Sequence, residues 1–165
     1  MNVRDYLIEQ EGKDWNEFML DWGFLLPESF TIWLVNRFGD IVMVLDDGSV
    51  HFFDVGVGII RRIADNREHF CTLVDLGDNA DAWLKTGITD SCVAACLTLA
   101  PNQCYGFKLP PIFGGKYSVE NIALTDLAVN YSFMADICGQ TKDLPTGARV
   151  KIVVTKAPDR VPPAQ

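Results

Sequence analysis

The sequence predicts a single α+β domain in which helices precede and follow an antiparallel β-meander. The clearest observation is a set of three extended segments, residues 41–45, 50–54 and 59–64, that are rich in Val, Ile and Phe. Turns of four residues join them, and connections this short favour antiparallel pairing. Apolar residues at helical spacing on both sides of this run complete the prediction.

We expect three helices before the meander, because apolar residues recur there at helical spacing. The first covers residues 3–8 and stops at Gly12. The second is capped by Asp14, and the third begins at Pro27 and stops at Gly39. The inward-facing residues of the second and third helices are Trp15, Phe18, Met19, Trp22, Phe30, Trp33 and Leu34.

The meander itself is expected to carry helices on one face, because its first two strands have apolar side chains at adjacent as well as alternating positions. Its second turn, Val-Gly-Val-Gly at residues 55–58, resembles part of a dinucleotide-binding loop. The third glycine and the following helix are missing, so a hairpin turn is the better interpretation.

From residue 65 onward the helical period returns, and Gly77 interrupts it. Asp78 is expected to cap a short helical turn. Thr89 or Asp90 is expected to cap a longer helix that ends before the proline at position 101.

The last part of the chain is expected to alternate between strand and helix. Residues 104–109 and 122–124 are predicted strands that return to the meander. Thr125 or Asp126 can cap a helix that runs to about residue 140, and residues 149–154 are predicted as a final strand.

Length and charge limit the function. A chain of 165 residues fits one domain, expected over residues 1–156, with a mobile tail at residues 157–165 that contains three prolines. The net charge is −8, which disfavours direct binding of nucleic acid or of an anionic membrane and favours a basic protein partner. The chain starts without the pattern of a secretory signal, so a cytoplasmic protein is expected.

No catalytic, cofactor-binding or metal site is predicted from local motifs. The five cysteines form no Cys-x-x-Cys pair, so we expect five free thiols, with Cys92 and Cys96 buried on one helix face. His51 and His69 have no companion ligands at metal-binding spacing and are interpreted as structural and surface histidines. A catalytic site assembled across the fold stays possible, because such sites depend on geometry and not on sequence order.

Two groups of carboxylates are candidates for partner binding. Asp46, Asp47 and Asp54 flank the first hairpin, and Asp75, Asp78 and Asp81 recur every three residues. Capping and solvated turns explain such residues equally well. The functional interpretation is an acidic surface that attracts a basic partner, with the hairpin group presented better than the second group.

The most unusual segment, residues 104–121, contains two prolines, three glycines and four aromatic residues. Together with two other segments it resembles a bacterial domain family that includes the C-terminal domain of Tdi. Tdi is the immunity protein that neutralises Tde, a DNase effector of type VI secretion. The segments that carry the resemblance are residues 26–40 with 45–51 and 54–58, residues 105–117 with 119–121, and residues 142–145 with Gly147.

The resemblance covers about residues 3–154 and implies a non-enzymatic antitoxin that binds a cognate toxin. A looser resemblance to SUKH-type immunity proteins, in residues 26–39, agrees with an α+β fold. The alternative function is a small-molecule binder or enzyme with a pocket near the loop between Pro110 and Gly115. Its candidate polar residues are Tyr105, Lys108, Lys116 and His51.

Overall fold

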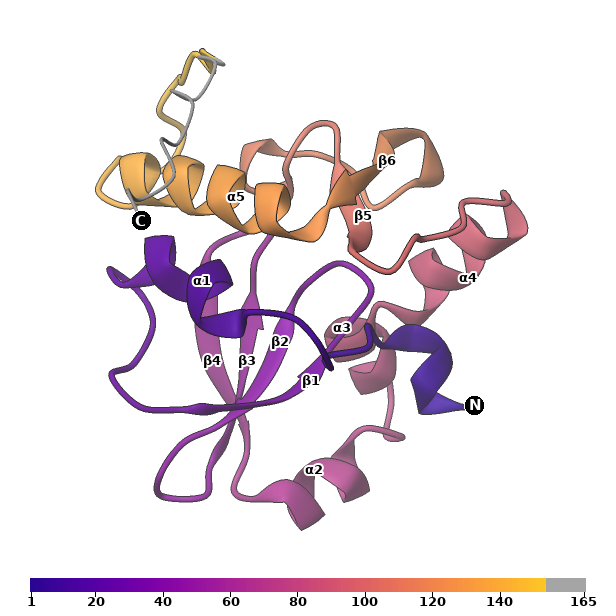
Figure 1. Ribbon diagram of the computed structural model, residues 1–165. Coiled ribbons are helices and arrows are strands. Elements are labelled where there is room, and N and C mark those ends of the chain that lie inside the picture. Colours follow the sequence, from indigo (N-terminus) through magenta and orange to yellow (C-terminus); the bar gives the residue numbers. More distant parts are fainter. Residues whose placement is uncertain (154–165) are drawn as a thin grey trace, which may run out of the picture.

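The computed structural model describes residues 1–153 and confirms the α+β class (Figure 1). Four antiparallel strands form the main sheet in the order β1-β2-β3-β4, and two further strands form a separate antiparallel ribbon. The strands are β1 (Thr31–Val35), β2 (Ile41–Val44), β3 (Val50–Asp54), β4 (Ile59–Ala64), β5 (Gln103–Phe107) and β6 (Ile122–Asp126). The α-helices are α1 (Trp15–Met19), α2 (Arg67–Leu73), α3 (Asn79–Leu84), α4 (Thr86–Ala94) and α5 (Leu127–Thr141).

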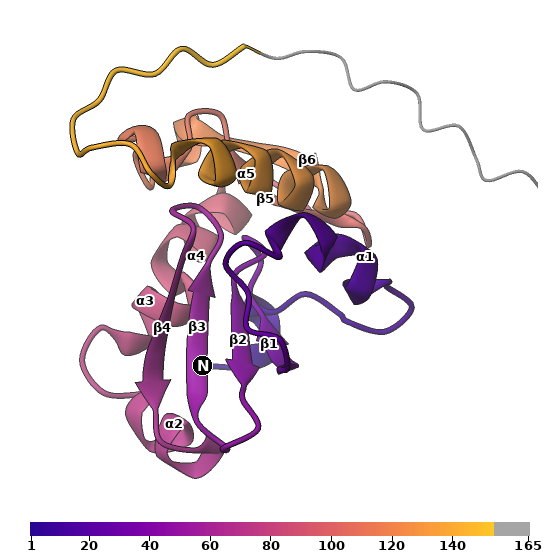
Figure 2. The same cartoon turned by 90° about the vertical axis from the view of Figure 1, so that its left-hand side faces the viewer.

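Both faces of the main sheet are covered, so the expectation of one covered face is wrong. One face packs against α1, the 3-10 turn after it (Leu20–Trp22) and α5, and its core cluster includes Ile41, Met43 and Tyr131. The other face packs against α2 and α3, which lie on the opposite side of the sheet from α1 in Figure 2. Successive side chains of a strand point to opposite faces, so a strand buried on both faces is apolar throughout.

The late strands pair with each other and not with the meander, which corrects the prediction that they return to it. β5 and β6 pair from Gln103 opposite Asp126 to Phe107 opposite Ile122. Their own small core joins Tyr105 to Phe38. A backbone hydrogen bond of 2.8 Å from the amide of Tyr105 to the carbonyl of Arg37 ties the ribbon to the main sheet.

The predicted helix at residues 27–39 is wrong, because Thr31–Val35 forms the edge strand β1. β1 pairs with β2, and the register shifts between Ile32 and Leu34. The apolar residues of this segment fit a helical stripe and a strand equally well. Its β-branched residues at positions 31, 32 and 35 are stiff side chains that fit a sheet better than a helix.

Two predicted helix caps are confirmed, whereas Asp78 precedes α3 but its side chain accepts no capping hydrogen bond. The side chains of Asp14 and Asp126 accept hydrogen bonds from the backbone amides of Glu17 and Val129, as expected for caps of α1 and α5. The first predicted helix shrinks to one 3-10 turn, Val3–Tyr6. α4 begins at Thr86, before both expected caps, and ends at Ala94.

The C-terminal prediction is only partly tested. Residues 149–153 form no strand, while the last residue of that predicted strand and the predicted tail at residues 157–165 lie outside the described residues. All five cysteines are free thiols. Cys92 is buried as expected, but Cys96 is exposed, because it follows the end of α4 in a left-handed conformation (φ 60°).

The unusual segment between β5 and β6 is a loop held together by Asn121. The side-chain amide of Asn121 donates to the carbonyls of Leu109 and Lys116 at 2.9 Å, and its oxygen accepts from the amide of Leu109. The loop docks on the β3–β4 turn, where the amide of Ile112 donates to the carbonyl of Gly56. The prolines and glycines are therefore structural, as expected for the Gly-Gly pair.

Gly115 is required in this loop by a close backbone approach. A Cβ atom at Gly115 would lie 1.7 Å from the carbonyl oxygen of Leu109, whereas Gly114 has open space around it and only a positive φ of 83°. We expect Gly115→Ala to lower the free energy of unfolding by at least about 2 kcal/mol. Gly114→Ala, the neighbouring control, should cost about 1 kcal/mol from backbone strain alone. Urea unfolding followed by tryptophan fluorescence measures both, and an equal cost for the two would contradict this account.

Candidate functional site

Lys85 lies at the corner between α3 and α4, where the chain turns sharply. It ends α3 and precedes α4 in a left-handed conformation, with φ 51°. This conformation usually belongs to glycine or asparagine at a helix end. The carboxylate of Asp81 stabilises the corner by accepting from the amide of Gly87 at 2.8 Å. A lysine in this position has its side chain directed into the protein, and Lys85 is only 6% exposed.

The Lys85 ammonium forms a buried ion pair with Asp40. Its Nζ lies 2.5 Å from Oδ2 of Asp40, and both side chains are almost fully buried. Asp40 also accepts hydrogen bonds from the side-chain amide of Asn36 and from the backbone amide of Val55, both at 2.9 Å. Asn36 in turn donates to the carbonyl of Trp83 in α3. The network connects the β1–β2 turn, the end of β3 and the α3–α4 corner.

Burial and charge act in opposite directions on Lys85. Burial works to lower the pKa of the ammonium, but the carboxylates of Asp40 and Asp54 outweigh it, and the net shift is upward. Three aromatic rings, those of Phe38, Phe52 and Tyr117, surround the ammonium with centroids 5.5 to 6.0 Å from Nζ. Lys85 is therefore a protonated cation at neutral pH.

Asp54, the last residue of β3, is the second buried carboxylate of this site. It is 8% exposed, and its Oδ1 is buried with no hydrogen-bond partner among residues 1–153. Burial and the nearby charge of Asp40 raise the pKa of Asp54 to about 6, although Lys85 and Arg61 act against that rise. A buried carboxylate oxygen without a donor is unfavourable in a folded protein.

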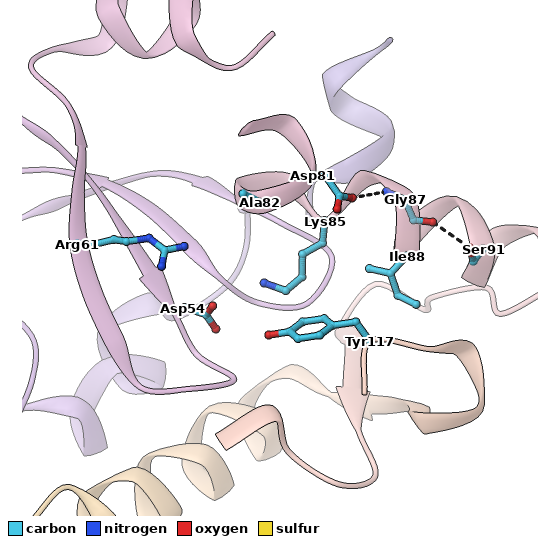
Figure 3. A pocket seen from close by; sticks show the side chains of 9 residues that line it. All are labelled: Asp54, Arg61, Asp81, Ala82, Lys85, Gly87, Ile88, Ser91 and Tyr117. Atoms are coloured by element: carbon cyan, nitrogen blue, oxygen red, sulfur yellow. Dashed lines mark hydrogen bonds between the residues drawn. The ribbon is translucent and has the colours of Figure 1, made fainter. Parts of the chain in front are cut away.

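These groups border a cavity of about 510 Å³, shown in Figure 3. The side chains of Asp54, Lys85 and Tyr117 point toward one another there, and Arg61 of β4 lies beside them. Tyr117 comes from the loop that Asn121 holds, and it is half exposed. The cavity is lined by Asp54, Arg61, Asp81, Ala82, Lys85, Gly87, Ile88, Ser91 and Tyr117.

The six carboxylates that sequence reasoning selected are distributed over three places. Asp46 and Asp47 are exposed in the β2–β3 turn, where Asp46 accepts from Ser29 and Asp47 from Ser49. Asp75 and Asp78 are exposed in the α2–α3 connection. Asp81 caps the α3–α4 corner and lines the cavity together with Asp54.

Asp54 is not part of an exposed hairpin surface, which corrects the expectation for that residue. It lies at the end of β3 that is far from the β2–β3 turn. The pair of adjacent phenylalanines before it marks a buried strand, and that was the available signal. The sequence shows that Asp54 ends a strand, but it does not show whether that end of the strand is exposed to solvent.

The four polar residues of the predicted alternative pocket do not line this cavity. The hydroxyl of Tyr105 donates to the carbonyl of Leu97, and Lys108 donates to the carbonyl of Glu120. His51 lies 3.0 Å from the hydroxyl of Ser49, in agreement with a structural role. Lys116 is exposed.

Lys85, Asp40 and Arg61 were not selected from the sequence. Lys85 and Asp40 are 45 residues apart, and no local pattern links them. Among residues 1–153, no group of three or more His, Cys, Asp or Glu side chains could hold a metal ion. In the same part of the chain, no helix combines the length and apolar character that crossing a membrane requires.

Comparison with known proteins supports the resemblance found in the sequence. Residues 64–138 match the model of the family described as "T6SS immunity protein Tdi1, C-terminal". This match confirms the resemblance to the Tdi-type family. No curated protein matches the chain significantly.

Among solved structures, the chain is similar to the crystal structure of Atu4351 from Agrobacterium tumefaciens. The two share 16% sequence identity with a TM-score of 0.47. The similarity covers 73% of this chain and 61% of that one.

Stability should depend on pH through Asp54. Its pKa is about 6 in the folded protein, against 3.8 in an unfolded chain, so folding takes up a proton between these values. Wild-type stability therefore falls as the pH rises from about 4 to about 6 and stays reduced above that. We expect Asp54→Asn to raise the free energy of unfolding by about 2 to 3 kcal/mol at pH 7.5 and to have little effect at pH 4. Urea unfolding at both pH values tests this, with the exposed Asp143→Asn as control, and a gain independent of pH would contradict it.

Removing the charge of Lys85 should lower the free energy of unfolding, in contrast to Asp54→Asn. Lys85→Met leaves Asp40 buried with one donor fewer and no counter-ion, and we expect a loss of about 3 to 5 kcal/mol at pH 7.5. Lys142→Met is the matched control, because Lys142 is an exposed cation 5.4 Å from the Phe24 ring centroid. The control should cost no more than about 1 kcal/mol. Equal losses in thermal or urea unfolding would show that the Lys85–Asp40 pair does not stabilise the fold.

Proposed function

We propose that this protein is an immunity protein that neutralises a type VI secretion effector by binding it, without catalysing a reaction. The observation that carries the proposal is the match of residues 64–138 to the Tdi1 C-terminal family. That segment runs from the last residue of β4 through most of α5. It includes the α3–α4 corner and Tyr117, and thus one side of the cavity.

The pKa shifts of Lys85 at the cavity and of two buried thiols elsewhere support a binding role over nucleophilic catalysis. A lysine that acts as a nucleophile or base needs a lowered pKa, and the pKa of Lys85 is raised. Burial also raises the pKa of the thiols of Cys104 and Cys138, to about 12 and about 11. Thiols with such values are poor nucleophiles at neutral pH.

The charge of the protein supports a basic partner, which we expect it to meet in the cytoplasm. With a net charge of −8, the chain repels phosphate groups and attracts cationic protein surfaces. Asp46, Asp47, Asp75 and Asp78 are exposed and can contribute to this attraction. The carboxylates of Asp54 and Asp81 belong to the cavity and contribute at shorter range.

The direct test is to express the candidate effector encoded beside this protein in bacterial cells, with and without the protein. We expect survival only when both are present, and a complex of fixed stoichiometry on size-exclusion chromatography. If the effector remains toxic and no complex forms with any neighbouring gene product, the proposed function is wrong.

Charge should affect how fast the complex forms. We expect the association rate constant to fall as salt rises, because exposed charges act over only about 8 to 10 Å at physiological ionic strength. Asp46→Lys and Asp75→Lys should each slow association, because both carboxylates are exposed. Stopped-flow or surface-based kinetics compare the two single reversals with Asp143→Lys as control. An association rate that salt leaves unchanged would remove the electrostatic part of the proposal.

A further inference from the structure

The unpartnered oxygen of Asp54 is the starting point for a more specific assignment. Asp54 is more than nine-tenths buried, and it faces the cavity beside Lys85 and Tyr117. Its Oδ1 meets no donor from residues 1–153. Buried polar atoms in folded proteins are nearly always hydrogen-bonded, so an orphan acceptor that lines a cavity indicates a donor that arrives from outside.

The charges around the cavity favour a positively charged donor. Lys85 does not donate to Oδ1 of Asp54, and its ammonium is paired with Asp40. Arg61 lies with its guanidinium 5.5 Å from the centroid of the Phe52 ring. Two carboxylates, Asp54 and Asp81, and two cations, Arg61 and Lys85, line the cavity. Since Asp40 behind the lining already neutralises Lys85, counting it too leaves one negative charge in excess.

An anionic ligand fits this arrangement less well. It would lie against Asp54 and Asp81, the charge of Lys85 is already neutralised by Asp40, and Arg61 alone would remain to attract it. A neutral donor could satisfy the oxygen of Asp54, but hydrogen bonds between a cation and a carboxylate are shorter and stronger. Apolar atoms of Ala82, Ile88 and the Tyr117 ring line the cavity beside these charges, and they suit the alkyl stem of a long basic side chain.

We propose that the cavity receives a lysine or arginine side chain of the effector, whose charged end donates a hydrogen bond to Oδ1 of Asp54. That the cation belongs to an effector rests on the proposed function, whereas the existence of a cation site rests on the residues of the cavity. In the complex the basic side chain enters past Tyr117 and Asp81, and its charge offsets the excess negative charge around Asp54. The buried acceptor thereby gains the partner that the free protein lacks.

The first experiment tests the cation site without an effector. The protein, labelled with ¹⁵N, is titrated with n-butylguanidinium and n-butylammonium, and with butanesulfonate as the anionic counterpart. We expect saturable amide shifts at Asp54, Gly87 and Tyr117 with at least one cation and none with the sulfonate. Asp54→Asn should weaken cation binding at least tenfold, and Asp143→Asn should not change it. Saturation by the sulfonate, no shift with either cation, or equal binding by Asp54→Asn would overturn the assignment.

The second experiment identifies the source of the cation. The dissociation constant of the effector complex is measured with wild type, Asp54→Asn and Asp143→Asn, and we expect a loss of at least tenfold for Asp54→Asn alone. Replacing single lysines and arginines of the effector by methionine should reveal one whose loss has no further effect in the Asp54→Asn background. If the effector binds both proteins equally, this inference fails and the proposed function stands. If the butyl cations bind but no effector does, the occupant is a free cationic compound, and both the side-chain assignment and the proposed function fail.

Discussion

The rest of this structure depends on the buried ion pair between Lys85 and Asp40. Burying two charges is expensive, and such a pair is stable only when other hydrogen bonds complete it. Here Asn36 and the amide of Val55 supply those bonds to Asp40. Since the donors come from separate segments, the pair determines where the α3–α4 corner sits on the sheet. It contributes positional specificity, while the two apolar cores on the faces of the sheet contribute most of the stability.

The parts of the fold that could be predicted are those whose signal is local. β3 and β4 have the predicted bounds, because turn residues and β-branched residues mark them within a few positions. Residues 31–35 were predicted as a helix but form a strand. Their apolar residues fit both the helical and the strand periodicity, and only the pairing with β2 distinguishes the two. Asp54 was expected at the surface because it was grouped with the hairpin carboxylates, although the buried pair Phe52 and Phe53 before it indicated burial. Lys85 could not be predicted as a site residue, because its partner Asp40 is 45 residues away in the sequence.

The segment that is most distinctive in sequence supplies little of the site's charge. Its prolines, glycines and Asn121 build a rigid loop, and only Tyr117 from that loop reaches the cavity. A rigid support of this kind fixes the position of a half-exposed aromatic ring beside two buried charges. The most distinctive segment of the sequence is therefore not the source of the charged groups at the cavity. Its loop positions one side chain, that of Tyr117.

The boundaries of the family match divide the residues of this site into two groups. The match starts at residue 64, so Asp40, Asp54 and Arg61 lie outside it, whereas Lys85, Asp81 and Tyr117 lie inside it. β1, β2, β3 and all of β4 except its last residue are also outside, so the matched stretch lacks the main sheet and is not a folding unit by itself. The cavity therefore takes Lys85, Asp81 and Tyr117 from the matched stretch and Asp54 and Arg61 from the sequence before it. A substitution at position 54 or 61 would change the charge of the cavity without altering the matched stretch.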